Sequence, residues 1–132
     1  MIAPGAGTGI ICKERAVEPT PGKAFYRRQI AALEALDLDA LLRQYHPDAS
    51  MIGFDFAVKG LAAIRKHLAG YLERLGTLKL KSTDKFTETE DAIFFEATIT
   101  SRLGEARVYD VFLLRDGKAT HHFTGVLSLQ AS

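Results

Sequence analysis

The sequence predicts an α+β domain in which three N-terminal helices pack into the concave face of a curved, mainly antiparallel sheet. Two features of the hydrophobic pattern support this prediction. Apolar residues recur at helical spacing up to Gly76, and beyond it they alternate with polar residues as they do in half-buried strands. Helices followed by a meandering sheet are typical of the α+β class, and a curved sheet can bury the apolar helix stripes.

The first helix is predicted to begin at Thr20-Pro21, because the threonine side chain can cap free N–H groups and proline suits a first turn. Its apolar stripe continues for about four turns. A second, shorter helix follows, with Asp37 or Asp39 as its cap and Tyr45 on its apolar face. His46-Pro47-Asp48 is predicted to end it, with the histidine capping the last turn.

Residues 49–56 are predicted to form a short strand and a loop. The third helix begins after Gly60 and keeps its apolar residues at a period of about 3.6. It stops at Gly76, where glycine supplies the left-handed conformation that often ends a helix.

Beyond the third helix, the alternating pattern predicts four long antiparallel strands. Three turns separate them, at residues 87–91, at Leu103-Gly104-Glu105 and at Asp116-Gly117. One face of this sheet is expected to be buried and the other to be wet.

The length of 132 residues fits one domain, which we divide into an N-terminal arm, residues 1–22, and a folded part, residues 23–132. The arm has no sustained period and is rich in Gly, Pro, Ala and Thr, which indicates an extended or flexible segment. Its glycines do not match a phosphate-binding motif. Ile10-Ile11-Cys12 could lie along a partner subunit or along the chain's own sheet edge.

Charge and cysteine content argue against several classes of protein. The chain has 17 basic and 16 acidic side chains without a dense basic cluster, so nucleic acid is not an expected partner. A single cysteine excludes an intramolecular disulfide and a cysteine-based zinc site, and we expect no metal and no cofactor. The sequence shows neither a signal-peptide pattern nor a long apolar run, so we expect no membrane association and a cytoplasmic location.

The segment Tyr109–Thr124 contains two apolar strands that carry one acid and two histidines. Burying the Asp110 carboxylate in such a run is costly unless the group is paired or hydrogen-bonded, so Asp110 predicts a polar cavity beside this strand. Alternatively, Asp110 faces solvent opposite a lysine or arginine. In the cavity interpretation Phe112 shares its face and Val111 points away. Such a desolvated acid suits a general acid or a hydrogen-bond donor.

His121 and His122 do not form a metal site together, because adjacent strand residues point to opposite faces. His67 flanks the apolar stripe of the third helix, so we interpret it as structural, as we do His46.

Four motifs carry a resemblance to a known fold family: Leu38-Asp39-Ala40-Leu41-Leu42, Tyr45-His46-Pro47-Asp48-Ala49, Lys59-Gly60-Leu61-Ala62-Ala63-Ile64 and Val111-Phe112-Leu113-Leu114-Arg115-Asp116-Gly117-Lys118. Their order and residues resemble the nuclear-transport-factor-2-like superfamily, and within it the SnoaL-like polyketide cyclase group. The resemblance implies a cone-shaped domain with a pocket between the concave sheet face and the helices, and a homodimer through the outer surface of the sheet. It specifies fold better than chemistry.

The resemblance also allows the enzyme branches of this superfamily to be compared residue by residue. The general-base aspartate of ketosteroid isomerases falls on Gly53 and their catalytic tyrosine on Gln29, whereas their oxyanion-hole aspartate aligns with Asp110. In the limonene-epoxide hydrolases the water-activating acid falls on Thr124. Asp55, close to Gly53 in sequence, is a second polar candidate at the pocket mouth, and its alternative is an ordinary turn.

Register with the family implies that His122, Thr124 and Val126 face inward and that His121 faces outward, towards a dimer contact. His122 is then an acid or base partner for Asp110 on the neighbouring strand. The alternative is a structural histidine at the pocket wall or the sheet rim.

We therefore predict a cofactor-independent cyclase, isomerase or dehydratase that acts on a small apolar molecule with a carbonyl or enol group, with Asp110 and His122 as catalytic residues. Two alternatives are a non-catalytic binder of such a molecule, favoured by the missing acids at Gly53 and Thr124, and a dimerisation module with a vestigial pocket. The residues predicted to line the pocket are Tyr26, Tyr45, Phe54, Asp55, Phe56, Leu68, Phe86, Phe95, Phe112, Thr124 and Val126.

Overall fold

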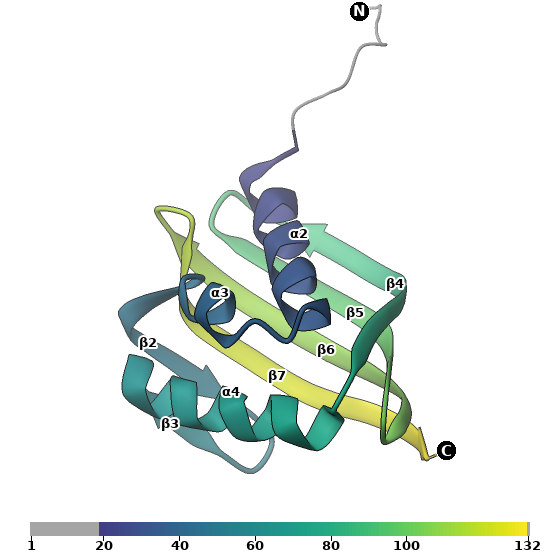
Figure 1. The fold of residues 1–132 in the computed structure, drawn as a ribbon. Helices are drawn as coiled ribbons and strands as arrows, with labels where there is room; N and C mark the ends of the chain where they lie inside the picture. The colour runs from purple at the N-terminus through teal and green to yellow at the C-terminus, as the bar shows by residue number, and fades with distance from the viewer. Residues whose placement is uncertain (1–18, 132) are drawn as a thin grey trace, which may run out of the picture.

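The computed structural model describes residues 19–131 of the chain, and it confirms the predicted α+β fold. Three helices lie on one side of a curved six-stranded sheet (Figure 1). The predictions for residues 1–18, including Ile10-Ile11-Cys12, lie outside the described residues. Helix α2 already begins at Pro21, so the last two residues assigned to the arm belong to this helix.

The first long helix has the predicted start, and the second has both predicted ends. Helix α2 (Pro21–Glu34) is capped by the Thr20 side chain, which accepts a hydrogen bond from the backbone N–H of Lys23 at 3.1 Å. Helix α4 (Leu61–Leu75) follows Gly60 and ends at Gly76, whose φ of 69° is favourable for glycine. Both helices bury one stripe against the concave face of the sheet.

The end of the second helix differs from the prediction. Helix α3 (Leu38–Leu42) is capped by Asp37 and stops after five residues. Tyr45 opens strand β2 (Tyr45–Ile52) instead of extending the helix. The reason is a strand pairing between residues distant in sequence, which local periodicity cannot predict. Ala119 donates its backbone N–H to the Gln44 carbonyl oxygen at 2.7 Å, and β2 then runs parallel to β7, the last strand (Lys118–Ala131). His46 does not cap the helix, because its Nε2 lies 2.6 Å from the carbonyl oxygen of Arg115.

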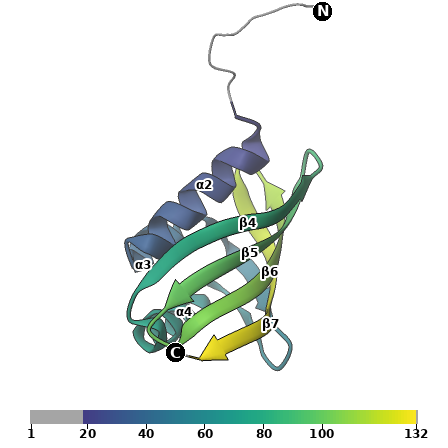
Figure 2. The ribbon, with the colours of Figure 1, turned by 90° about the vertical axis from the view of Figure 1, so that its right-hand side faces the viewer.

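The sheet has the strand order β3-β2-β7-β6-β5-β4, and all neighbours are antiparallel except β2 and β7. The four predicted long strands are confirmed as β4 (Leu78–Glu88), β5 (Ala92–Ser101), β6 (Gly104–Arg115) and β7 (Lys118–Ala131). Strand β3 (Ala57–Lys59) adds a short edge beside β2. Figure 2 shows how the long strands curve around the helices.

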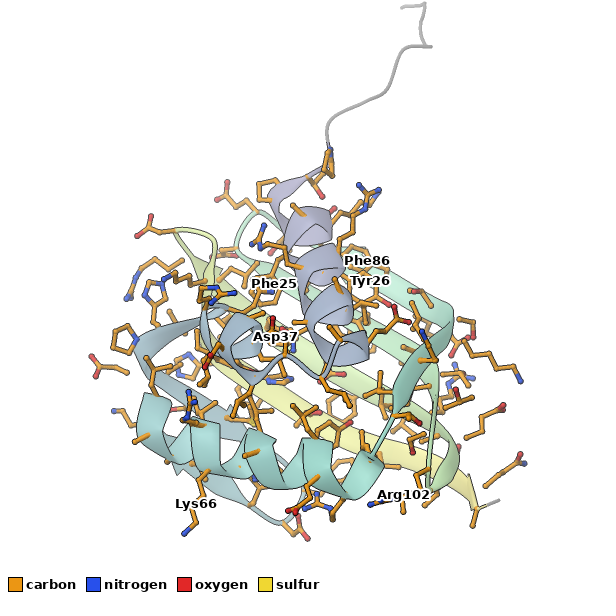
Figure 3. All side chains as sticks on the ribbon, in the orientation of Figure 1. Phe25, Tyr26, Asp37, Lys66, Phe86 and Arg102 are labelled. Atoms are coloured by element: carbon orange, nitrogen blue, oxygen red, sulfur yellow. The ribbon has the colours of Figure 1, made fainter. Side chains whose placement is uncertain are left out.

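Aromatic side chains fill the space between α2 and the sheet. Phe25 of α2 meets Phe112 of β6 edge to face, with ring centroids 4.8 Å apart, and both side chains are fully buried. Tyr26 packs against Phe86 at β4, where the centroids are 5.4 Å apart (Figure 3). At the far end of α4, Arg102 donates to the carbonyl oxygens of Glu73 and Arg74, each at 2.9 Å, and so satisfies the last turn of this helix.

Truncating the central aromatic residue should destabilise the whole domain. We expect Phe112→Ala to lower the free energy of unfolding by about 3–5 kcal/mol, because it removes a buried ring and leaves a cavity. Leu113→Ala is the matched control, since Leu113 is the next residue of the strand and lies on the opposite face, 36% exposed; it should cost about 1 kcal/mol. Urea unfolding measures both, and equal losses would contradict this account of the core.

Candidate functional site

A cavity of about 560 Å³ lies between the concave face of the sheet and helices α2 and α4. Its volume is in the range of small-molecule sites, about 300–1,000 Å³. Strands β5, β6 and β7 form one wall, and loop 53–56 borders the opening. The predicted pocket-lining residues that line this cavity are Phe54, Asp55, Phe56, Leu68, Phe95, Thr124 and Val126, together with Asp110 and His122.

Four residues of the predicted lining do not reach this cavity. Tyr45 and Phe112 are buried in the core behind it, with 1% and 0% of their surface exposed. Tyr26 and Phe86 pack on each other towards the β4 edge, and the Tyr26 hydroxyl lies 2.6 Å from that of Thr83. Regular apolar spacing identifies a buried face, but it does not separate core positions from the wall of a cavity.

Asp110 lies in the cavity wall, so its solvent-facing alternative is contradicted. Its side chain is 14% exposed, and its Oδ1 is 2.6 Å from Nε2 of His122. Register explains the pairing, because Asp110 stands opposite Thr124 and His122 stands opposite Phe112. Asp110 and His122 are therefore diagonal neighbours on one face of adjacent strands.

His122 is held on three sides. Its ring stacks on Phe112 with centroids 3.9 Å apart and an interplanar angle of 17°. Nδ1 lies 2.8 Å from the Tyr45 hydroxyl, while Nε2 faces Asp110. Burial, and secondarily the Asp110 charge, raises the pKa of Tyr45, so this hydroxyl keeps its hydrogen and can donate it to Nδ1.

These contacts divide the roles in the site. His122 lines the cavity, but both of its nitrogens are engaged by protein groups, so neither is free to hydrogen-bond a ligand. Within residues 19–131, Oδ2 of Asp110 has no hydrogen-bond partner, and it is the oxygen left to a ligand. The arrangement suits proton transfer at Asp110, with His122 as the group that orients and supports the carboxylate.

Helix α4 adds residues to the site that sequence patterns did not identify. His67, interpreted as structural, lines the cavity and stacks on Phe56 with centroids 4.0 Å apart. Tyr71 and Arg74 follow it along the same helix, and burial raises the pKa of Tyr71 to about 12. Helical spacing could have identified the pair of His67 and Tyr71, because Tyr71 lies three residues after Leu68 and four residues after His67.

Gln29 of α2 also lines the cavity, and only 4% of its surface is exposed. The sequence contained a signal for it: a polar residue that shares the buried stripe of α2 with Phe25 and Ala32. A buried amide needs hydrogen-bond partners. A glutamine in an apolar stripe therefore marks a residue that takes part in a hydrogen-bond network or in function.

The turn at the opening of the cavity has no free space for a side chain at Gly53. Gly53 sits in a tight turn closed by its N–H bonding to the Phe56 carbonyl at 2.9 Å, and a Cβ at this position would collide with the Phe56 ring. Asp55 lines the exposed rim. Phe54, 70% exposed, packs on Tyr109 with ring centroids 5.7 Å apart. A side chain at position 53 therefore requires the Phe56 ring or the loop to move.

The described residues contain a second hollow, of about 650 Å³, between α2, α3 and the turn from β6 to β7. Charged side chains such as Arg28, Arg43 and Lys118 line it, and Gln44 is also among its lining residues.

Within residues 19–131, no three His, Cys, Asp or Glu side chains gather closely enough to hold a metal ion. No helix in that range combines the length and apolarity needed to cross a bilayer.

Comparison with known proteins identifies a family for this chain and solved structures that share its fold. The family model for the SnoaL-like domain matches residues 26–122. No curated protein matches the chain.

Several solved structures share the fold. A candidate polyketide cyclase from Sinorhizobium meliloti is 17% identical with a TM-score of 0.68, and the match covers 76% of this chain and 93% of that chain. A SnoaL-like protein of unknown function from Burkholderia thailandensis is 16% identical with a TM-score of 0.72, covering 86% and 100%. A candidate hydroxylase from Streptomyces galilaeus is 20% identical with a TM-score of 0.67, covering 79% and 77%.

Removing the Tyr45 hydroxyl should leave a buried nitrogen of His122 without a partner. We expect Tyr45→Phe to lower the free energy of unfolding by about 1–3 kcal/mol. Tyr109→Phe is the matched control on the outer face, and it should change stability by about 0.5 kcal/mol or less. Chemical denaturation measures both variants. A Tyr45→Phe protein as stable as the control would contradict the hydrogen bond to His122.

His67 should make the protein sensitive to mild acid. Burial, with a smaller effect of Arg74, lowers the pKa of His67, so the unfolded chain binds a proton first as the pH falls through about 6.5. Folding stability is then lost at lower pH and regained above it. We expect His67→Gln to show a smaller loss of unfolding free energy than the natural protein between about pH 7 and pH 5.

Lys66→Gln, on the exposed side of the same helix (Figure 3), controls for substitution in α4. The account of His67 is wrong if His67→Gln loses as much stability on acidification as the natural protein and this control.

Proposed function

This chain belongs to the SnoaL-like domain family, and from that premise we propose that it is a small-molecule enzyme. It binds an apolar compound with a carbonyl or enol group and acts on it by acid/base chemistry, as a cyclase, isomerase or dehydratase. One observation carries the proposal: a carboxylate, Asp110, stands in the wall of an otherwise largely apolar cavity with one oxygen bonded by His122 and the other unengaged within residues 19–131.

The cavity walls support the choice of ligand class. Aliphatic and aromatic side chains from α2, α4 and the sheet form most of the surface, including Leu33, Leu68, Phe95 and Val108. Such a wall favours an apolar ligand body, while the few convergent polar groups orient it. Fold neighbours that include a candidate polyketide cyclase are consistent with a ligand of this kind.

Proton transfer at Asp110 can serve all three reaction types. The carboxylate takes a proton from the carbon next to a carbonyl, and the electron pair of that C–H bond forms the enolate. Returning the proton to another carbon completes an isomerisation. Giving it to a departing hydroxyl completes a dehydration. In a cyclisation the enolate carbon attacks a second carbonyl, and the proton passes to the new alkoxide.

A second candidate function is binding without turnover. It is favoured by the absence of a second acid where related enzymes carry one, because position 53 is glycine and position 124 is threonine. Asp55 lies on the loop at the rim of the cavity, whereas Asp110 lies on a strand of its wall. The wall strands therefore carry one carboxylate that faces the cavity. A homodimer through the outer face of the sheet stays a prediction.

The first experiment asks whether the cavity takes a ligand. Thermal-shift measurements against hydroxylated aromatics, steroids and polyketide-like ketones should give a raised melting temperature with at least one class, because a ligand that binds only the folded state stabilises it. Leu68→Trp, which fills the cavity from α4, should abolish this shift. A full screen without any shift would contradict both functions.

The second experiment separates catalysis from binding. With a compound that binds, we expect Asp110→Asn to lower turnover by about 10²–10⁴-fold while keeping affinity within a few-fold, since the amide still accepts from His122 but cannot take a proton. Asp48→Asn, an exposed aspartate on β2, is the control and should leave turnover unchanged. Turnover that survives Asp110→Asn would exclude Asp110 as the base, and binding without any turnover in the natural protein would favour the second function.

A further inference from the structure

Three polar side chains follow one another along the face of helix α4 that borders the cavity. His67, Tyr71 and Arg74 stand at positions i, i+4 and i+7 of the helix, and all three line the cavity. The leucines of the neighbouring stripe are buried in the core instead. Because a few polar groups in an apolar cavity wall serve to orient a ligand, this face of α4 indicates which groups the ligand carries.

Arg74 brings a positive charge to the cavity that no acid of the described residues pairs with. Within residues 19–131 its guanidinium forms no ion pair, although Asp55 and Asp110 also line the cavity. The side chain lies back along the helix, since its Nη1 would be 3.8 Å from a Cβ placed on Gly70. The guanidinium therefore lies near the helical turn that carries Tyr71, with its donors available.

Capping of the helix does not explain Arg74. A basic side chain in the last turn of a helix often donates to the free carbonyl groups at that end. In α4 this role belongs to Arg102, whose Nη2 donates to the carbonyl oxygens of Glu73 and Arg74 at 2.9 Å each. The Arg74 side chain makes no hydrogen bond of this kind within the described part of the chain, so its contact with the cavity needs another reason.

Tyr71 adds a hydroxyl that also has no partner in the protein. Its ring packs against the core, but within residues 19–131 no group accepts from its hydroxyl or donates to it. The hydroxyls of Tyr26 and Tyr45, in contrast, have Thr83 and His122 at 2.6 and 2.8 Å. Burial raises the pKa of Tyr71 to about 12, so the phenol keeps its hydrogen at neutral pH and can donate it. A desolvated hydroxyl without a partner is unfavourable, and a ligand can supply the missing acceptor.

We propose that Tyr71 and Arg74 bind an anionic oxygen of the ligand, so that the compound taken up by the cavity is an organic acid, either a carboxylate or an ionised enol. The inference rests on the proposed function for its premise that the cavity takes an apolar ligand. One guanidinium and one hydroxyl match the single charge of such a group, because the planar N–H fork suits paired oxygens and the phenol adds a third donor. The acid end of the ligand is then held at α4, while Asp110 reaches the ligand from the sheet.

Paired probes test the charge with the natural protein. The ions 2-naphthoate and lawsone, an enol acid that is ionised at neutral pH, are each compared with a neutral analogue of similar shape, 2-naphthamide and the methyl ether of lawsone. We expect the acid of at least one pair to bind about tenfold more tightly than its neutral analogue, because hydrogen bonds to a charged group are the stronger ones. Isothermal titration calorimetry measures the four affinities. The pair that shows the difference identifies the acid as a carboxylate or as an enol.

Variants of α4 locate the binding group. Arg74→Gln removes the charge and Tyr71→Phe removes the hydroxyl, and each should weaken binding of the preferred acid about tenfold while leaving its neutral analogue unchanged. Arg74→Lys keeps the charge without the planar fork and should restore part of the affinity. Lys66→Gln removes a positive charge from the exposed side of the same helix, and it should leave both affinities unchanged.

The stability of Tyr71→Phe provides a readout without any ligand. We expect this variant to unfold at the same denaturant concentration as the natural protein, because its hydroxyl has no hydrogen bond within residues 19–131 to lose. Tyr45→Phe, which loses the hydrogen bond to His122, is the contrasting variant. A Tyr71→Phe protein destabilised as much as Tyr45→Phe would assign the Tyr71 hydroxyl to the protein and not to a ligand.

Three outcomes of the binding measurements would overturn the inference. One is equal affinity for the acid and the neutral analogue in both pairs, which needs no variant to observe. Another is full affinity for the preferred acid in Arg74→Gln, which would place the acid elsewhere on the protein. The third is a lack of binding by either acid. The proposed function is judged separately, because a neutral ketone or steroid that raises the melting temperature leaves it standing when the acids fail.

Discussion

A carboxylate on the concave face of a packed sheet must be hydrogen-bonded, and here that requirement joins the core to the cavity. Asp110 is bonded by His122, and the burial of His122 creates a second requirement, which Tyr45 meets at 2.8 Å. The imidazole also stacks on Phe112, whose ring packs on Phe25 of α2. The geometry of the candidate site is therefore set by the same contacts that hold the first helix on the sheet.

The curvature of the sheet provides the space for a ligand. Helices α2 and α4 cover the concave face of the curved sheet (Figures 1 and 2). The cavity lies between these helices and the sheet. In the loop at its opening, the Phe56 ring occupies the place that a side chain at position 53 would take. Asp110 therefore stands in the wall of the cavity as a carboxylate bonded by His122 at one oxygen.

Much of this arrangement follows from local sequence. The cap at Thr20, the stop at Gly76 and the Asp116-Gly117 turn mark element ends by residue type, and both turn residues have the positive φ values, 54° and 77°, of a tight hairpin. Alternation along the last strand predicted that His121 and His122 point to opposite faces, and the register implied by the family resemblance put His122 on the face of Asp110. His121 then points away, which agrees with its pairing opposite the exposed Leu113.

The sequence by itself determined the three helices and the four long strands that follow them, and it determined that His121 and His122 point to opposite faces, because side-chain direction has a fixed period in each element. Only the tertiary structure decided the role of Tyr45. Its spacing from Leu38 and Leu41 fits a helix, but pairing of β2 with β7 draws it into a strand beside His122. The hydrogen bonds of Gln44 to Arg28, to the Phe25 carbonyl oxygen and to Gln29 likewise join residues far apart in sequence, and such bonds arise from packing distances that no local pattern records.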